Sequence, residues 1–139
     1  MKKIMVLAMV ALITACASNE ESTMATEDTA VAEVEESSPK LRHVVMFKFK
    51  DESTDEDIQS VVDAFANLPN EIPEIKGFEW GINNSPEGLN DGLTHCFTLT
   101  FDSEEGRAVY LPHPAHKAFG EILGPHLDKV TVVDYWTQD

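Results

Sequence analysis

Hydrophobic and polar residues alternate along four stretches in the C-terminal two thirds of the chain. Such alternation is typical of a β-strand that buries one face. The segment Asn83–Gly92, which is rich in turn-forming residues, predicts a hairpin loop between the second and third of these strands. The four predicted strands are Leu41–Lys50, Phe78–Ile82, Leu93–Phe101 and Asp128–Trp136.

A helical pattern lies between the first two strands. Ser53 and Glu56 have the spacing of a capping box, which predicts a helix start, and Pro69 and Pro73 predict its end. The apolar residues between these limits recur every three or four positions, as expected for a helix that packs one face on a core. They are Ile58, Val61, Val62, Phe65 and Leu68.

A second helical region follows the third strand. Asp102 or Ser103 can cap its start, and the following Glu104 and Glu105 suit the positive end of a helix. We expect a break at Pro112–Pro114, because each proline removes a backbone donor and Pro114 disfavours helical geometry at His113. The second piece is expected to end near Gly124-Pro125.

The order of these elements is β-α-β-β-α-β, which predicts an α+β, ferredoxin-like fold with an antiparallel four-stranded sheet. Two helices form one layer and leave the other sheet face uncovered. That face is semi-apolar, with Val44 and Met46 on the first strand and Cys96 among threonines on the third. A homodimer with the two sheets face to face would cover it.

The N-terminal third has a different composition. Residues 1–15 carry Lys2 and Lys3 and then a short apolar run, which predicts a secretory signal peptide rather than a membrane-spanning helix. The ending Ile13-Thr14-Ala15-Cys16 resembles the lipobox of bacterial lipoproteins, which implies cleavage before Cys16 and a palmitate-type acyl anchor on its sulfur. With Ala17 next, we expect a lipid anchor in the outer membrane facing the periplasm.

Residues 16–38 are acidic and nearly free of large apolar side chains, so they predict a disordered tether, with a short helix as the alternative. The folded domain is expected over residues 39–139. The whole chain has 25 acidic and 10 basic residues, a formal charge of −15. This charge argues against nucleic acid as a partner, because phosphate contacts need a basic surface. A small molecule or another protein is the expected partner.

Several short segments resemble a known family, and the Tyr-Leu-Pro-His-Pro-Ala-His run is the most distinctive. In their order along residues 39–139 they resemble the stress-responsive A/B barrel domain family, whose members form dimeric α/β barrels and include polyketide cyclases. The resemblance implies a homodimer and no metal or organic cofactor. The segments are Leu41–Lys50, Ile72-Pro73, Trp80-Gly81, Thr94-His95, Tyr110–His116 and Val133–Tyr135.

The resemblance also implies catalytic roles for His116, as general base, and for Tyr110, as hydrogen-bond donor to an oxyanion. A histidine suits proton transfer near neutral pH, and a tyrosine hydroxyl can stabilise a developing enolate. The two are six residues apart, on different faces of an unbroken helix, so the proline break must bring them together. Phe65 stands where the cyclases look to have a tyrosine.

Other candidate ligand-binding residues are His43 and His95, on the strand face rich in Phe and Leu, and Phe65 and His113. Alternatively, His43 and His95 are hydrogen-bonded core residues, and His113 bonds a helix end. Metal binding by His113, His116 and His126 has only a weak spacing argument. Cys96 fits a pocket or interface thiol better than a nucleophile, since His95 points to the opposite face.

Three functions remain open. The first is a membrane-tethered homodimer that binds a small apolar or aromatic ligand in a pocket between sheet and helices. The second is a cofactor-free cyclase or isomerase that uses His116 and Tyr110. The third is a structural stress protein without a pocket.

Overall fold

The computed structural model describes residues 38–138. The expected signal peptide, the lipid anchor at Cys16 and nearly all of the tether lie outside the described residues. Within residues 38–138 no helix is long and apolar enough to cross a membrane. The described elements are β1 (Leu41–Phe49), α1 (Asp55–Glu71), β2 (Gly77–Ile82), β3 (His95–Phe101), α2 (Glu104–Tyr110), α3 (Pro114–Leu123) and β4 (Leu127–Trp136).

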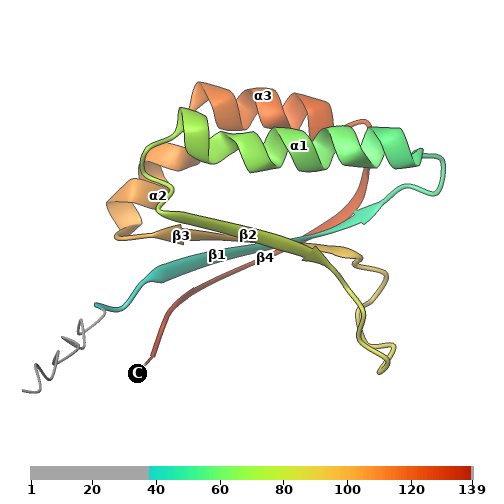
Figure 1. Ribbon diagram of the computed structural model, residues 1–139, viewed down its shortest axis with the longest axis horizontal. Helices are drawn as coiled ribbons and strands as arrows, with labels where there is room; N and C mark the ends of the chain where they lie inside the picture. Colours follow the sequence, from blue (N-terminus) through green and yellow to red (C-terminus); the bar gives the residue numbers. More distant parts are fainter. Residues whose placement is uncertain (1–37, 139) are drawn as a thin grey trace, which may run out of the picture. The chain divides into compact units, whose positions relative to one another are not determined.

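The four strands form one antiparallel sheet in the order β2-β3-β1-β4, and the helices cover one of its faces (Figure 1). This is the ferredoxin-like arrangement, so the predicted fold class is confirmed. The central strand β1 alternates strictly between buried and half-buried residues. Its helix-facing side is thereby fixed, because a slip of one residue would turn every apolar side chain to the other face.

The core under the helices is aromatic. Phe65 on α1 lies with its ring centroid 4.5 Å from that of Phe97 on β3 and 4.5 Å from that of Phe119 on α3. Phe47 on β1 stacks on Phe65 at 6.0 Å. Offset and tilted ring pairs at such distances stabilise a core beyond their area alone, so this cluster ties α1 and α3 to the middle of the sheet.

The start of α1 differs from the prediction by one residue, and its end lies between the two prolines that were predicted to end it. Thr54, not Ser53, is the N-cap: its hydroxyl accepts from the Asp57 amide, and the Asp57 carboxylate accepts from the Thr54 amide. Ser53 does not act as the cap: its hydroxyl lies 3.3 Å from Nδ1 of His126, and its amide closes the preceding turn on the carbonyl of Lys50. The helix also passes Pro69 and ends at Glu71, since a proline near the end removes only one internal hydrogen bond.

The second helical region breaks at the predicted place. Of the two predicted caps, Ser103 is the one used: its side chain accepts from the amide of Gly106. The chain then turns through Pro112, and His113 caps α3 by accepting the amide hydrogen of Ala115 on Nδ1. β3 begins at His95 rather than Leu93, because the amide of Leu93 still closes the loop on the carbonyl of Asn90.

Candidate active site

A cavity of about 330 Å³ lies between the helices and the β4 side of the sheet. Its walls are mostly aliphatic and aromatic, and they include Phe65. Its polar lining comes from four elements: β1 gives His43, α2 gives Tyr110, α3 gives His116 and β4 gives Asp134. A largely apolar cavity with a few converging polar groups is the usual form of a small-molecule site.

Tyr110 and His116 come together at this cavity. Tyr110 is the last residue of α2 and His116 lies in the first turn of α3, so the Pro112–Pro114 break separates them. Their ring centroids are 4.3 Å apart. The break therefore produces the convergence that an unbroken helix would prevent.

The tautomer of His116 follows from its partner. Nδ1 lies 3.0 Å from the carbonyl oxygen of Leu111. A carbonyl can only accept, so neutral His116 carries its proton on Nδ1 and keeps a lone pair on Nε2. A lone pair on Nε2 is what a general base requires.

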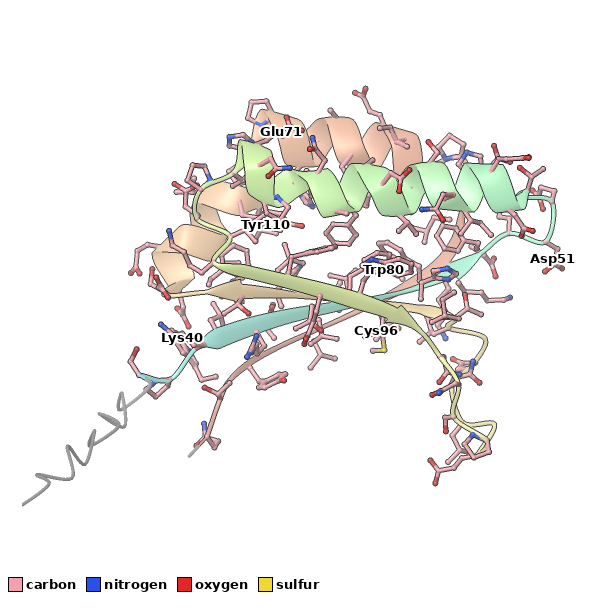
Figure 2. All side chains as sticks on the ribbon, viewed as in Figure 1. Lys40, Asp51, Glu71, Trp80, Cys96 and Tyr110 are labelled. Carbon is pink, nitrogen blue, oxygen red and sulfur yellow. The ribbon has the colours of Figure 1, made fainter. Side chains whose placement is uncertain are left out.

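Tyr110 is fully buried between the helices and the sheet (Figure 2). Its hydroxyl has no hydrogen-bond partner among the described residues. Burial raises the pKa of this hydroxyl well above its ordinary value, so it remains a neutral donor throughout the physiological range. An unpartnered buried hydroxyl costs about 1–3 kcal/mol, and such a group in a native protein calls for a functional explanation.

Sequence reasoning missed two polar residues at this site. Asp134 Oδ1 lies 2.6 Å from Nδ1 of His43, and Asp134 Oδ2 lies 3.2 Å from Nη1 of Arg107 on α2. The sequence did hold one signal for Asp134, namely the alternation of side chains along the strand. Asp134 lies on the helix-facing side of β4 with Val130 and Val132, and an acidic residue is unusual on that side.

Two predicted ligand contacts do not line this cavity. His113 caps α3, which agrees with the alternative prediction that it bonds a helix end. The cap fixes the start of the helix that carries His116. His95 lies at the beginning of β3 and contributes to a different cavity. The reason is distance along the sheet: His43 is paired with Leu99, four residues beyond His95.

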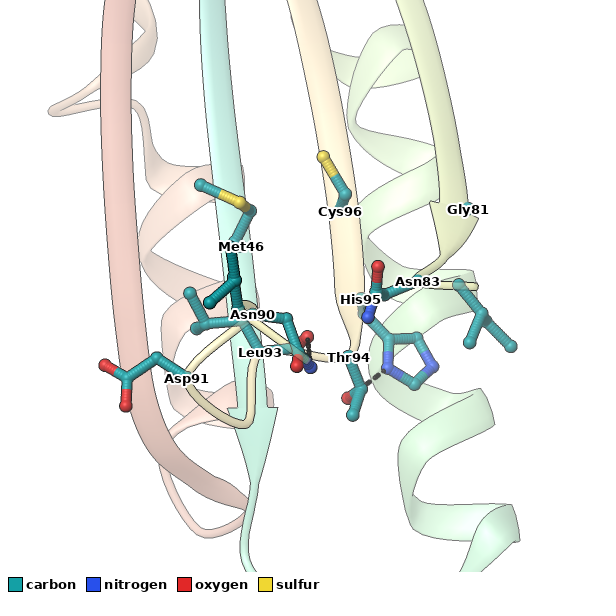
Figure 3. A pocket seen from close by; sticks show the side chains of 11 residues that line it. Met46, Gly81, Asn83, Asn90, Asp91, Leu93, Thr94, His95 and Cys96 are labelled. Atoms are coloured by element: carbon teal, nitrogen blue, oxygen red, sulfur yellow. Dashed lines mark hydrogen bonds between the residues drawn. The ribbon is translucent and has the colours of Figure 1, made fainter. Parts of the chain in front are cut away.

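That other cavity, of about 510 Å³, lies beside the Asn83–Gly92 loop (Figure 3). Met46 and Cys96, paired residues of neighbouring strands, line it, and His95 Nδ1 lies 2.9 Å from Thr94 Oγ1. Burial lowers the pKa of His95. Asp91 and Cys96 also line this cavity, but Asp91 is paired with Lys129, and within residues 38–138 neither forms a hydrogen bond to His95, so His95 is the weaker candidate for catalysis. Nor do any three His, Cys, Asp or Glu side chains in this range come together as a metal site would require.

Comparison with known proteins agrees with this architecture. The family model described as the stress responsive A/B barrel domain matches residues 41–137. Over 102 residues the chain is 43% identical to the stress-response A/B barrel domain-containing protein HS1 of Arabidopsis thaliana, covering 73% of this chain and 94% of that protein. It is 34% identical over 95 residues to olivetolic acid cyclase of Cannabis sativa, covering 68% and 94%.

Solved structures show the same fold. A hydroxynitrile lyase from Passiflora edulis matches with a TM-score of 0.68 and 27% identity, covering 72% of this chain and 94% of that one. A dimeric ferredoxin-like protein of unknown function from Thermobifida fusca matches with a TM-score of 0.60 and 29% identity, covering 71% and 92%. The chain therefore belongs to the stress-responsive A/B barrel domain family.

Proposed function

We propose that the chain binds a small, mostly apolar carbonyl compound in the His43–Tyr110–His116 cavity and catalyses proton transfer on it without a cofactor. The observation that carries the proposal is the pair Tyr110 and His116. The Tyr110 hydroxyl is buried and has no hydrogen-bond partner within residues 38–138, and the Tyr110 ring packs on the ring of His116. Nδ1 of His116 is occupied by the carbonyl of Leu111, and its Nε2 has no partner in the same range.

The chemistry of this pair suits removal of a proton next to a carbonyl group. Nε2 of His116 can take the proton from carbon, while the Tyr110 hydroxyl donates to the oxygen that becomes negative. The apolar walls strengthen both interactions because they exclude water. A ring closure and an isomerisation can each begin with this step. One relative is named olivetolic acid cyclase, and this name supports the reaction class.

Exchange of α-protons tests the proposal without knowledge of the natural substrate. The full chain, with Cys16→Ser so that it cannot be acylated, is incubated in D2O with phenylacetone, a small aromatic ketone. Deuterium incorporation is followed by proton NMR. We expect measurable catalysis by the wild-type sequence and a loss of about 10²–10⁴-fold in His116→Gln, the range for removal of a general base.

His95→Gln is the matched control, because His95 is a half-buried histidine of the same domain that lines the other cavity. It should exchange the ketone at the wild-type rate. Equal rates in His116→Gln and the wild type would refute the role of His116. No exchange above the buffer rate in any variant would refute proton transfer on this class of compound.

We further propose that the chain is a homodimer whose sheets pack through the face opposite the helices. Val133 and Tyr135 on β4 are about half exposed there, next to Val44 and Met46 on β1. Apolar side chains in such a row on a monomer mark an interaction surface. Several structural relatives are described as dimeric, which supports this arrangement.

Light scattering checks the dimer. The full chain with Cys16→Ser should show twice its monomer mass of 15.4 kDa at micromolar concentration. The substitution Val133→Asp should shift the mass toward the monomer, because it places a charge in the centre of the contact. Val109→Asp is the matched control, since Val109 is equally exposed but lies on α2. A wild-type monomer would contradict the proposal.

The place of action is proposed from the sequence alone. The signal-like residues 1–15 and the lipobox ending in Cys16 support a domain tethered to the bacterial envelope.

A further inference from the structure

Three charged or polar side chains from separate elements form one connected network at the edge of the cavity. His43 of β1 forms a hydrogen bond with Asp134 of β4, and Asp134 forms an ion pair with Arg107 of α2. The register of the sheet places His43 and Asp134 directly opposite each other. His43 is buried, while Arg107 and Asp134 are partly exposed.

The chemical nature of the three groups fixes where the proton of His43 lies. A guanidinium can only donate and keeps its charge, so Arg107 holds the Asp134 carboxylate in its ionised form. An ionised carboxylate can only accept, so the Nδ1 atom of His43, 2.6 Å away, must carry the proton. Neutral His43 therefore has its lone pair on Nε2.

Nε2 of His43 is free to act on a ligand. No residue within 38–138 forms a hydrogen bond to it, although His43 lines the cavity. The His43 ring meets Tyr110 edge-on, with centroids 5.7 Å apart, while His116 contacts the same tyrosine at 4.3 Å. Two imidazoles, each with an occupied Nδ1 and a free Nε2, thus contact one phenol ring.

We infer that Asp134, held by Arg107, is a positioning residue that sets the tautomer of His43 and so makes its Nε2 a second proton acceptor beside Tyr110. This inference rests on the proposed function and deepens it. After an imidazole accepts a proton on Nε2 it becomes a general acid, and it can return that proton to the substrate. With a second acceptor the site can act at two positions of one substrate, because each imidazole takes a proton and returns it at the position that it faces.

The substitution Asp134→Asn separates this role from that of an ordinary ion pair. Arg107 can only donate hydrogen bonds, so it should donate to the amide oxygen of the new side chain. The amide nitrogen then faces Nδ1 of His43, so Nδ1 must accept and the proton must move to Nε2. An ion pair that merely holds β4 in place would lose stability without this change of tautomer.

The tautomer is measured by long-range ¹H–¹⁵N NMR on the full chain with Cys16→Ser. Spectra are recorded over a series of rising pH values and are interpreted where the imidazole ¹⁵N shifts no longer change with pH. In the wild type we expect the protonated-type ¹⁵N shift on Nδ1 and the unprotonated type on Nε2. In Asp134→Asn the protonated-type shift should move to Nε2 and the unprotonated type to Nδ1. The rate of deuterium exchange into phenylacetone should fall at least tenfold, while KM changes little.

Two further variants complete the test. In Arg107→Leu with Asp134→Asn, the amide is free to rotate, so its oxygen should again accept from Nδ1 and both the tautomer and the exchange rate should recover. Asp128→Asn, on the same strand but paired with Lys48 outside the cavity, should change neither.

An unchanged His43 tautomer in Asp134→Asn would overturn the inference. A changed tautomer with an unchanged rate of deuterium exchange into phenylacetone would overturn it too. Failure of the proposed function looks different: the wild type would then show no exchange, while the NMR shifts would still decide whether Asp134 sets the tautomer.

Discussion

Alanine in place of Phe65 is expected to destabilise the domain by about 3–5 kcal/mol, the usual cost of truncating a buried phenylalanine. Phe65 is 1% exposed and its ring contacts Phe97, Phe119 and Phe47. Its removal leaves a void between α1, α3 and the sheet that the surrounding rings cannot fill. Unfolding in urea, followed by far-UV circular dichroism, gives the free energy directly.

Two variants control this measurement. Phe65→Leu keeps part of the volume, so it should lose clearly less than Phe65→Ala. Leu89→Ala removes a similar apolar side chain that is 82% exposed in the β2–β3 loop, so it should change the free energy of unfolding by less than about 0.5 kcal/mol. A loss below about 1 kcal/mol in Phe65→Ala would show that the aromatic cluster does not hold the helices to the sheet.

The substitution Tyr110→Phe is expected to act on stability and on catalysis in opposite directions. It removes a buried hydroxyl that has no protein partner among the described residues, so the free energy of unfolding should rise by about 1–3 kcal/mol. It also removes the donor to the developing oxyanion, so phenylacetone exchange should fall by about 10²–10³-fold. Urea unfolding and the exchange assay on the same preparation measure both effects.

The control for this variant is Tyr135→Phe, which deletes a hydroxyl from a half-exposed tyrosine on β4. Its exchange rate should match the wild type, because Tyr135 lies on the sheet face opposite the helices and does not line the cavity. A lower stability in Tyr110→Phe would mean that the hydroxyl is satisfied in solution, and an unchanged exchange rate would remove Tyr110 from the proposed mechanism.

Much of the fold could be predicted because strand and helix periods are local properties of the sequence. The alternation in β1 and the break at Pro112–Pro114 each depend on neighbouring residues only. The start of α1 was one residue off for a reason the sequence does not display. Ser53 and Thr54 are both good caps with an acidic residue three positions later, and a long-range contact distinguishes them, because the Ser53 hydroxyl lies 3.3 Å from Nδ1 of His126.

The site could be predicted in part. The resemblance singled out Tyr110 and His116, and the structure places them in contact. The phase of Asp134 on β4 marks it as unusual, but its contacts with His43 and Arg107 could not be assigned, because they depend on the register of β1 against β4 and on the direction of α2, both long-range features. That His43 and His95 line different cavities could not be predicted either, since alternation gives the face of a strand but not the position along the sheet at which a cavity opens.

The aromatic cluster has a consequence for how this domain can evolve. Phe47, Phe65 and Phe119 belong to the stabilising core and also form a wall of the cavity. A mutation that reshapes this wall therefore also weakens the fold, and selection for a new ligand would act against selection for stability. Val130 and Val132 on β4 also line the cavity and are 45% and 49% exposed, so they can vary at little cost to the core. Diversification of ligand preference in this lineage should therefore be concentrated on β4.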